Sequence, residues 1–250
     1  MKLLKFNLSG KTAHFKKPDV NSYAYYTYNH IHRIALMGII GAVIGLRGYS
    51  HQYRQQDKYP EFYQELKDMR IGIVPPKDNR GYFSKKIITF NNSVGYANID
   101  AKNMPCNLVV REQWLEDVSW EIYLCLEDIQ NEEIQHKIVD YFMKGKSEYI
   151  PYLGKNDHFA EIKNSEILEC NAIDFCEEIH SLFYYDKAAL EEEPVDDEEL
   201  PFLYRDYIPT SLNGFNNKYE FKEVAFTNRA IEKIQDILIV HHNGTNIAFI

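Results

Sequence analysis

The order of hydrophobic patterns along the chain predicts an α+β fold of the ferredoxin-like or RRM type. Short alternating or apolar runs predict strands, and two longer periodic runs, residues 29–48 and 131–144, predict helices. Together they give the order strand, helix, strand, hairpin, strand, helix, strand, which is βαββαβ with an inserted hairpin. Residues 169–250 carry further strand patterns, so we expect an RRM-like domain over residues 1–168 and a small β-rich C-terminal region after it.

Residues 29–48, NHIHRIALMGIIGAVIGLRG, predict a buried helix around which the domain is organised. Asn29 can cap its start, and Gly48 can adopt the left-handed conformation after its end. Gly38 and Ala42 fall on one side with two further glycines. Because each glycine costs about 1 kcal/mol relative to alanine, we expect a sheet or another backbone to approach closely there. A core helix with incidental glycines is the alternative.

A membrane span and a phosphate-binding loop are disfavoured interpretations of the same stretch. The apolar run, residues 34–46, is shorter than the roughly 20 residues that cross a bilayer. No GK[ST] sequence follows the glycines, as a phosphate-binding loop requires.

Shorter patterns predict the other elements of the RRM-like domain. Runs bounded by turn residues predict the strands, Asn91-Asn92 is expected to turn a hairpin, and Gly145 is expected to end an amphipathic helix. The predicted strands cover residues 3–8, 70–75, 82–90, 93–99, 120–126 and 158–168, and the predicted helices cover residues 29–48, 60–69 and 131–144.

The C-terminal region contains strand patterns around an acidic stretch. The strands are expected at residues 179–185, 200–208, 219–226 and 237–240. Between the first two lies EEEPVDDEE, residues 191–199, which we interpret as a solvated acidic loop. A metal site there is disfavoured, because consecutive carboxylates without a fixed scaffold rarely converge on one ion. We therefore expect neither a metal nor a cofactor.

The charge distribution is more informative than the net charge of −9. Residues 1–90 hold 15 lysines and arginines against 6 acidic residues, whereas residues 91–250 hold 13 against 31. A basic front half suggests a polyanionic partner, and the acidic part would face solvent or protein. Chance patchiness is the alternative.

The cysteines and the N-terminus predict a cytoplasmic protein without a membrane partner. Cys106, Cys125, Cys170 and Cys176 form no CxxC pair, so free thiols are expected rather than a disulfide framework or a zinc site. Met1 is not followed by the apolar region of a signal peptide.

Basic and aromatic side chains are interleaved after the first predicted strand. Single-stranded nucleic acid is bound by cations at its phosphates and by rings against its bases. Solvated surface for the cations and core packing for the rings are the alternatives. The residues are Lys11, His14, Phe15, Lys16 and Lys17, followed by Tyr23, Tyr25, Tyr26 and Tyr28.

Further basic residues near the central helix and the predicted hairpin are candidate RNA contacts. The alternatives are helix capping for the arginines at the helix ends and exposed strand charge for the lysines. The residues are Arg33, Arg47, Arg54, Lys77, Arg80, Lys85 and Lys86.

Four stretches, spread in order over residues 1 to about 160, carry a family resemblance. They are FNLSGKTAHFKKP (Phe6–Pro18), RIALMGIIGAVIGL (Arg33–Leu46), VREQWLEDVSWEIYL (Val110–Leu124) and PYLGKNDHF (Pro151–Phe159). They resemble a CRISPR-associated RAMP family, the one numbered five among the Cas proteins, and the helix and PYLG stretches resemble its type I-B branch. The last 90 residues resemble the family only loosely.

The resemblance implies an RRM-like RAMP domain whose inserted hairpin, at about residues 77–108 with Lys77–Ile99 as its main part, forms a "thumb". It also implies a non-catalytic subunit of a type I Cascade complex that holds the 5′ handle of the crRNA in antiviral defence. The implied partners are the crRNA, the backbone subunit and the large subunit, with target DNA contacted only indirectly.

A metal-independent endoribonuclease that processes pre-crRNA repeats is the alternative function, as in the type I-C branch of the same family. Such an enzyme needs a base for the ribose 2′-hydroxyl and a cation for the phosphate. His14, His30, His32 and His51 could supply the base, but no spacing fixes them into a catalytic set.

Overall fold

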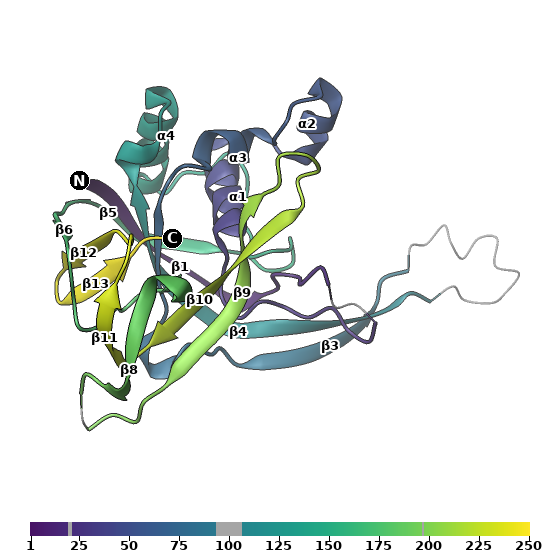
Figure 1. Ribbon diagram of the computed structural model, residues 1–250. Helices are drawn as coiled ribbons and strands as arrows, with labels where there is room; N and C mark the ends of the chain where they lie inside the picture. The colour runs from purple at the N-terminus through teal and green to yellow at the C-terminus, as the bar shows by residue number, and fades with distance from the viewer. Residues whose placement is uncertain (20–21, 94–106, 197) are drawn as a thin grey trace, which may run out of the picture.

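The computed structural model describes residues 1–19, 22–93, 107–196 and 198–250 and contains more strand than helix. Its main sheet has five strands, all paired antiparallel, in the lateral order β2-β4-β1-β5, with β3 pairing the far end of β4. Long strand β4 therefore serves both the body of the sheet and a projecting arm (Figure 1). The strands are β1 (Lys2–Ala13), β2 (Ile71–Val74), β3 (Lys85–Asn91), β4 (Val109–Cys125) and β5 (Glu161–Glu169).

Helices occur in both crossover connections of the sheet, as the sequence predicts, and each connection joins two strands that are separated by a third. Helix α1 connects β1 to β2, and α4 connects β4 to β5. Asn131 caps α4 by accepting from the amides of Glu133 and Ile134, and Gly145 follows the helix at a φ of 61°. The helices are α1 (Arg33–Ile44), α2 (Tyr49–Gln55), α3 (Glu61–Leu66) and α4 (Glu132–Met143).

Helix α1 is shorter at both ends than predicted. Its N-cap is His32, which accepts from the amide of Ala35, and its left-handed C-cap is Gly45 at a φ of 82°. Asn29 instead lies buried three residues earlier, where its side-chain oxygen accepts from the amide of Phe83. The helix ends at Gly45, which is the glycine of the apolar run that adopts the left-handed conformation.

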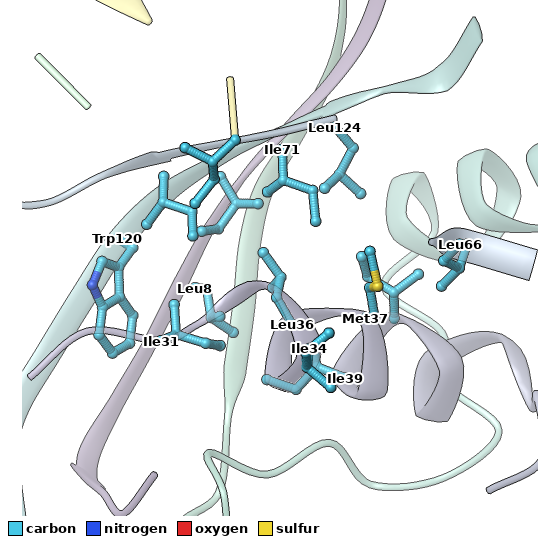
Figure 2. Packing of buried hydrophobic residues seen from close by; sticks show 14 of the residues in the cluster. Leu8, Ile31, Ile34, Leu36, Met37, Ile39, Leu66, Ile71, Trp120 and Leu124 are labelled. Carbon is cyan, nitrogen blue, oxygen red and sulfur yellow. The ribbon is translucent and has the colours of Figure 1, made fainter. Parts of the chain in front are cut away.

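The core lies between the sheet and α1. Side chains of α1 meet apolar residues of β1, β2 and β4, and Trp120 closes one end of the cluster (Figure 2). Gly41 faces α3: a Cβ there would lie 2.7 Å from the Cβ of Phe62, so the close approach predicted for the glycine side occurs at this residue. The helix is thereby fixed against both the sheet and α3.

The hairpin differs from its predicted form. Strand β3 pairs with residues 109–115 of β4, from Asn91 opposite Val109 to Lys85 opposite Leu115. The amide of Asn92 donates to the carbonyl of Leu108, so the pairing extends through Asn92 and the chain does not reverse at the Asn91-Asn92 pair. Most of the predicted strand 93–99 lies outside the described residues. The arm nevertheless projects away from the body (Figure 1).

The C-terminal region forms three small sheets that share a core with the main sheet. Residues of β9 and β10 belong to the same apolar cluster as α1, and Ile71 and Ile250 exchange both backbone hydrogen bonds. Part of the predicted acidic loop is strand, because residues 191–194 belong to β8, which pairs with β11. The strands are β6 (Ala172–Ile173), β7 (Phe183–Tyr184), β8 (Ala188–Pro194), β9 (Leu203–Leu212), β10 (Tyr219–Thr227), β11 (Arg229–Ile234), β12 (Ile239–His242) and β13 (Thr245–Ala248), and the short 3₁₀ turns are η1 (Lys77–Asn79), η3 (Leu126–Asp128) and η4 (Tyr185–Lys187).

Among the described residues, no individual helix has the length and apolar character needed to cross a membrane. Helices α1 and α2 meet that test only as a pair, bent by 83°. The same part of the chain contains no group of three or more His, Cys, Asp or Glu side chains that could hold a metal ion.

Two buried histidines should make the fold sensitive to acid. Burial lowers the pKa of His30 and of His32 from 6.5 to about 3. His30 accepts from Trp120 Nε1 through Nδ1, and His32 uses Nδ1 for the cap. The unfolded chain therefore binds more protons between pH 6.5 and about 3, so stability is full above pH 6.5 and is lost as the pH falls through that range.

Urea unfolding across this range measures the effect. Each histidine should contribute a slope of up to about 1.4 kcal/mol per pH unit. His32→Asn keeps a capping oxygen and removes the titrating group, so its slope should be lower, whereas His136→Asn on the exposed side of α4 controls for the loss of a histidine. Equal slopes in His32→Asn and the wild-type chain would contradict the assignment.

Candidate nucleic-acid interface

A groove of about 1210 Å³ opens over the side of α1 that the core leaves uncovered. Its floor includes Ala35, Gly38 and Ala42, which follow one another at helical spacing. A Cβ at Gly38 would have no heavy atom within 4 Å. The predicted approach of a backbone therefore does not occur at Gly38, where the missing side chain instead leaves the groove open.

One wall of the groove is the segment that follows α4. The amides of Glu148 and Tyr149 donate to the carbonyls of Val43 and Ala42 at 2.9 and 3.1 Å, which satisfies the last turn of α1. These hydrogen bonds fix the segment beside the helix and place Tyr149 and Tyr152 on the rim. The wall is thus a consequence of capping the C-terminus of α1.

Four cations line the groove: Lys16, Arg47, Arg54 and Lys155. Both arginines are exposed: Arg47 lies two residues before α2, and Arg54 lies in the last turn of α2. Neither arginine, nor Lys16, forms an ion pair with a carboxylate of the described residues. Their charge is therefore available to an anionic ligand.

Tyrosine rings accompany these cations. The side chains of Tyr49, Tyr149 and Tyr152 are 47, 63 and 45% exposed, and Tyr25 and Tyr219 complete the set along the groove. The Lys16 ammonium lies 3.8 Å from the centre of the Tyr25 ring. Cations beside exposed rings are the arrangement that single-stranded nucleic acid requires.

A buried carboxylate orients the fourth cation. Both oxygens of Glu112 accept from Lys155 Nζ at 2.9 Å, and Oε2 also accepts from Trp114 Nε1 at 2.9 Å. Burial alone would raise the pKa of Glu112, but these hydrogen bonds hold it below its usual value. Lys155 is thereby fixed at the wall with part of its charge neutralised.

Five of the predicted RNA contacts line the groove, but one cannot stack on a base. The five are His14, Phe15, Lys16, Arg47 and Arg54. Phe15 is only 2% exposed and meets Trp120 and His32 edge to face. Phe15 is therefore a core residue, which corrects its predicted stacking role.

Arg33 is held by the protein backbone. Its guanidinium donates to the carbonyls of Lys67, Thr210 at 3.2 Å and Met69 at 2.8 Å. Burial lowers the pKa of this guanidinium. Arg33 therefore ties α1 to the residues after α3 and to β9, and this position does not fit its predicted RNA contact.

The other predicted contacts lie outside the groove. Lys17, Lys77 and Lys86 pair with Asp206, Glu178 and Glu116 at 3.1, 3.4 and 2.6 Å. These pairings reduce the charge that each offers to RNA. Lys11, Arg80 and Lys85 are exposed but do not line the groove.

Sequence reasoning missed Lys155, Glu112 and the tyrosines Tyr49, Tyr149 and Tyr219. The PYLG stretch carries part of the family resemblance, and in the structure Tyr152 forms an antiparallel bridge with Phe159 there. The available signal was the recurrence of tyrosine beside a lysine in Tyr149–Lys155, which is the same interleaving of rings and cations that marks residues 11–28.

Three of the four histidines considered for catalysis, His14, His32 and His51, line the groove. His30 lies in the core, His32 is buried and caps α1, and His51 stands beside Arg47.

The fold belongs to the class seen in CRISPR-associated proteins, as two solved structures illustrate. A chain of a CRISPR RNA-guided surveillance complex is 11% identical, with 92% of this chain and 91% of that chain covered at a TM-score of 0.52. A CRISPR protein from Archaeoglobus fulgidus is also 11% identical, with 99% and 98% covered at a TM-score of 0.50. No protein-family model and no curated protein matches the sequence. At this identity the likeness establishes the fold.

Proposed function

We propose that this chain is a non-catalytic RNA-binding subunit of a CRISPR effector complex, and that the groove over α1 holds a single-stranded segment of the guide RNA. The groove carries the proposal, since it combines unpaired cations, exposed tyrosine rings and a floor without side-chain bulk. Phosphate contacts would position the strand and ring stacking would hold its bases.

The finer assignment is to the type I Cascade subunit that holds the crRNA 5′ handle. The four stretches shared with that family support it, and two of them, Arg33–Leu46 and Pro151–Phe159, supply the floor and one wall of the groove. The fold would then be a ferredoxin-like RAMP domain in a cytoplasmic complex.

The arm made by β3 and β4 would be the thumb of that assignment. It projects from the body (Figure 1), and Ile87, Leu108 and Val109 are 51, 55 and 60% exposed along it. Exposed apolar side chains on a projecting hairpin suit contact with a neighbouring backbone subunit. The large subunit would be the second protein partner.

Incubating the purified full chain with labelled repeat RNA in EDTA tests the proposal. We expect binding that prefers the 5′-handle segment over scrambled RNA, without cleavage. Specific cleavage at the handle boundary would replace the scaffold with the endoribonuclease. Absence of binding both to the repeat and to a random-sequence RNA pool would refute an RNA-binding groove.

A further inference from the structure

His14 presents an unused hydrogen-bond acceptor at the groove. The side chain is 1% exposed, and its Nε2 atom is buried without a hydrogen-bond partner among the described residues. A buried polar atom left unpaired costs about 1–3 kcal/mol. Such an atom in the wall of a binding groove is a candidate for contact with the ligand.

The opposite edge of the ring defines the tautomer. His14 Nδ1 lies 2.9 Å from the carbonyl oxygen of Gln113, and a carbonyl oxygen can only accept, so Nδ1 carries the hydrogen. Burial lowers the pKa of His14, which favours the neutral ring. In the neutral ring Nε2 has a free lone pair and no hydrogen, so it can pair only with a donor.

The backbone around His14 holds the ring in this orientation. The amide of His14 donates to the carbonyl of Leu153 at 3.1 Å. Gly154, at a φ of 90°, packs directly against the His14 carbonyl, where a Cβ would collide with it. The His14 backbone is therefore held against Leu153 and Gly154, while the hydrogen bond from Nδ1 to Gln113 of β4 orients the ring.

The surroundings indicate which part of a nucleotide would reach Nε2. Lys16 and Lys155 line the same groove and are close enough to His14 to affect its charge. Cations of this kind bind phosphates, so His14 lies at the level of the sugar–phosphate backbone. The donor that RNA carries at this level is the ribose 2′-hydroxyl, which DNA lacks.

We propose that His14 Nε2 accepts a hydrogen bond from the 2′-hydroxyl of a nucleotide bound in the groove, and that His14 thereby selects RNA over DNA. The proposal rests on the RNA-binding function proposed above. It assigns to a buried residue a specificity role that the exposed cations cannot perform, because phosphates are common to RNA and DNA.

Three variants of the full chain distinguish the loss of the Nε2 acceptor from the loss of the imidazole ring. His14→Asn can still donate to the Gln113 carbonyl but has no acceptor at the Nε2 position, whereas His14→Gln can place an amide oxygen there. His158→Asn is the matched control, because His158 also has a buried, unpaired Nε2 but does not line the groove.

The probes are random-sequence single-stranded pools of RNA, DNA and 2′-fluoro RNA, with binding measured by filter retention. The 2′-fluoro pool keeps the sugar pucker of RNA and removes only the hydroxyl donor. The wild-type chain and His158→Asn should prefer RNA over 2′-fluoro RNA by about tenfold, as expected for one hydrogen bond. His14→Asn should lose this preference, and His14→Gln should regain part of it.

Each alternative has its own result. If the wild-type chain binds no RNA pool, the proposed function fails. If it binds RNA but His14→Asn retains the full preference, a buried water satisfies Nε2 and the inference is wrong. If His14→Asn weakens RNA and 2′-fluoro RNA equally, a base donor occupies Nε2, which also overturns the assignment to the 2′-hydroxyl.

Discussion

Reversing Arg47 and Arg54 together to glutamate is expected to weaken RNA binding by at least about 100-fold, since each charge-assisted hydrogen bond contributes about 1.5–3 kcal/mol. Both guanidinium groups line the groove and neither has a carboxylate partner among the described residues. Losing two phosphate contacts should also reduce the salt slope of single-strand binding by about 1.4. Titrations of a labelled RNA at several salt concentrations measure both quantities.

A charge-matched control distinguishes contact from the general field of the protein. Lys2→Glu combined with Lys233→Glu changes the net charge equally, on exposed residues outside the groove. This pair should lower affinity only slightly and leave the salt slope unchanged. Arg47→Lys with Arg54→Lys should retain much of the binding. Equal losses in the groove pair and the control pair would remove the groove as the RNA site.

The order of the elements could be predicted from the sequence because each depends on local pattern. The amphipathic repeat of residues 131–144 and its end at Gly145 required no knowledge of tertiary contacts, and α4 matches them. The ends of α1 could not be predicted in the same way. Asparagine is a favourable N-cap residue, but the Asn29 side chain donates to the carbonyl of Gly81 and accepts from the amide of Phe83. His32 therefore caps α1.

The hairpin shows a second limit of local pattern. The Asn91-Asn92 pair has the composition of a turn, yet the ladder continues to Leu108. A strand pairs with whichever extended segment covers its edge, and β4 is long enough to serve both β1 and β3. The pairing of β3 with β4 therefore extends through two residues whose composition is typical of a turn.

Only part of the candidate site could be predicted from the sequence, because residue type does not show which partner a side chain meets in the fold. Lys16, Arg47 and Arg54 were selected from charge and order, and they meet at one groove. Phe15 and Arg33 were selected by the same criteria, but one side chain packs against Trp120 and the other binds three carbonyls. Residue type indicates what a side chain can bind, whereas only tertiary structure determines which partner it meets first.

Gly38→Leu is expected to weaken RNA binding by about 10- to 100-fold, because filling a fitted space typically costs about 1–3 kcal/mol. The substitution should not destabilise the protein. A Cβ at Gly38 meets no heavy atom within 4 Å, and the position lies in the interior of α1. Replacing a glycine in a helix should instead stabilise it by about 1 kcal/mol, which corresponds to a Tm increase of about 2–4 °C for a chain of this size.

Two alanine variants of the same helix make this result specific to the groove. Gly38→Ala should gain the same stability and retain RNA binding, because one methyl group leaves most of the floor open. Gly41→Ala should lower Tm, since its Cβ would lie 2.7 Å from that of Phe62 on the covered side of α1. The small residues of α1 thus have two separate roles, close packing at Gly41 and open space at Gly38. Full RNA binding by Gly38→Leu at a raised Tm would show that the ligand does not use the floor of the groove.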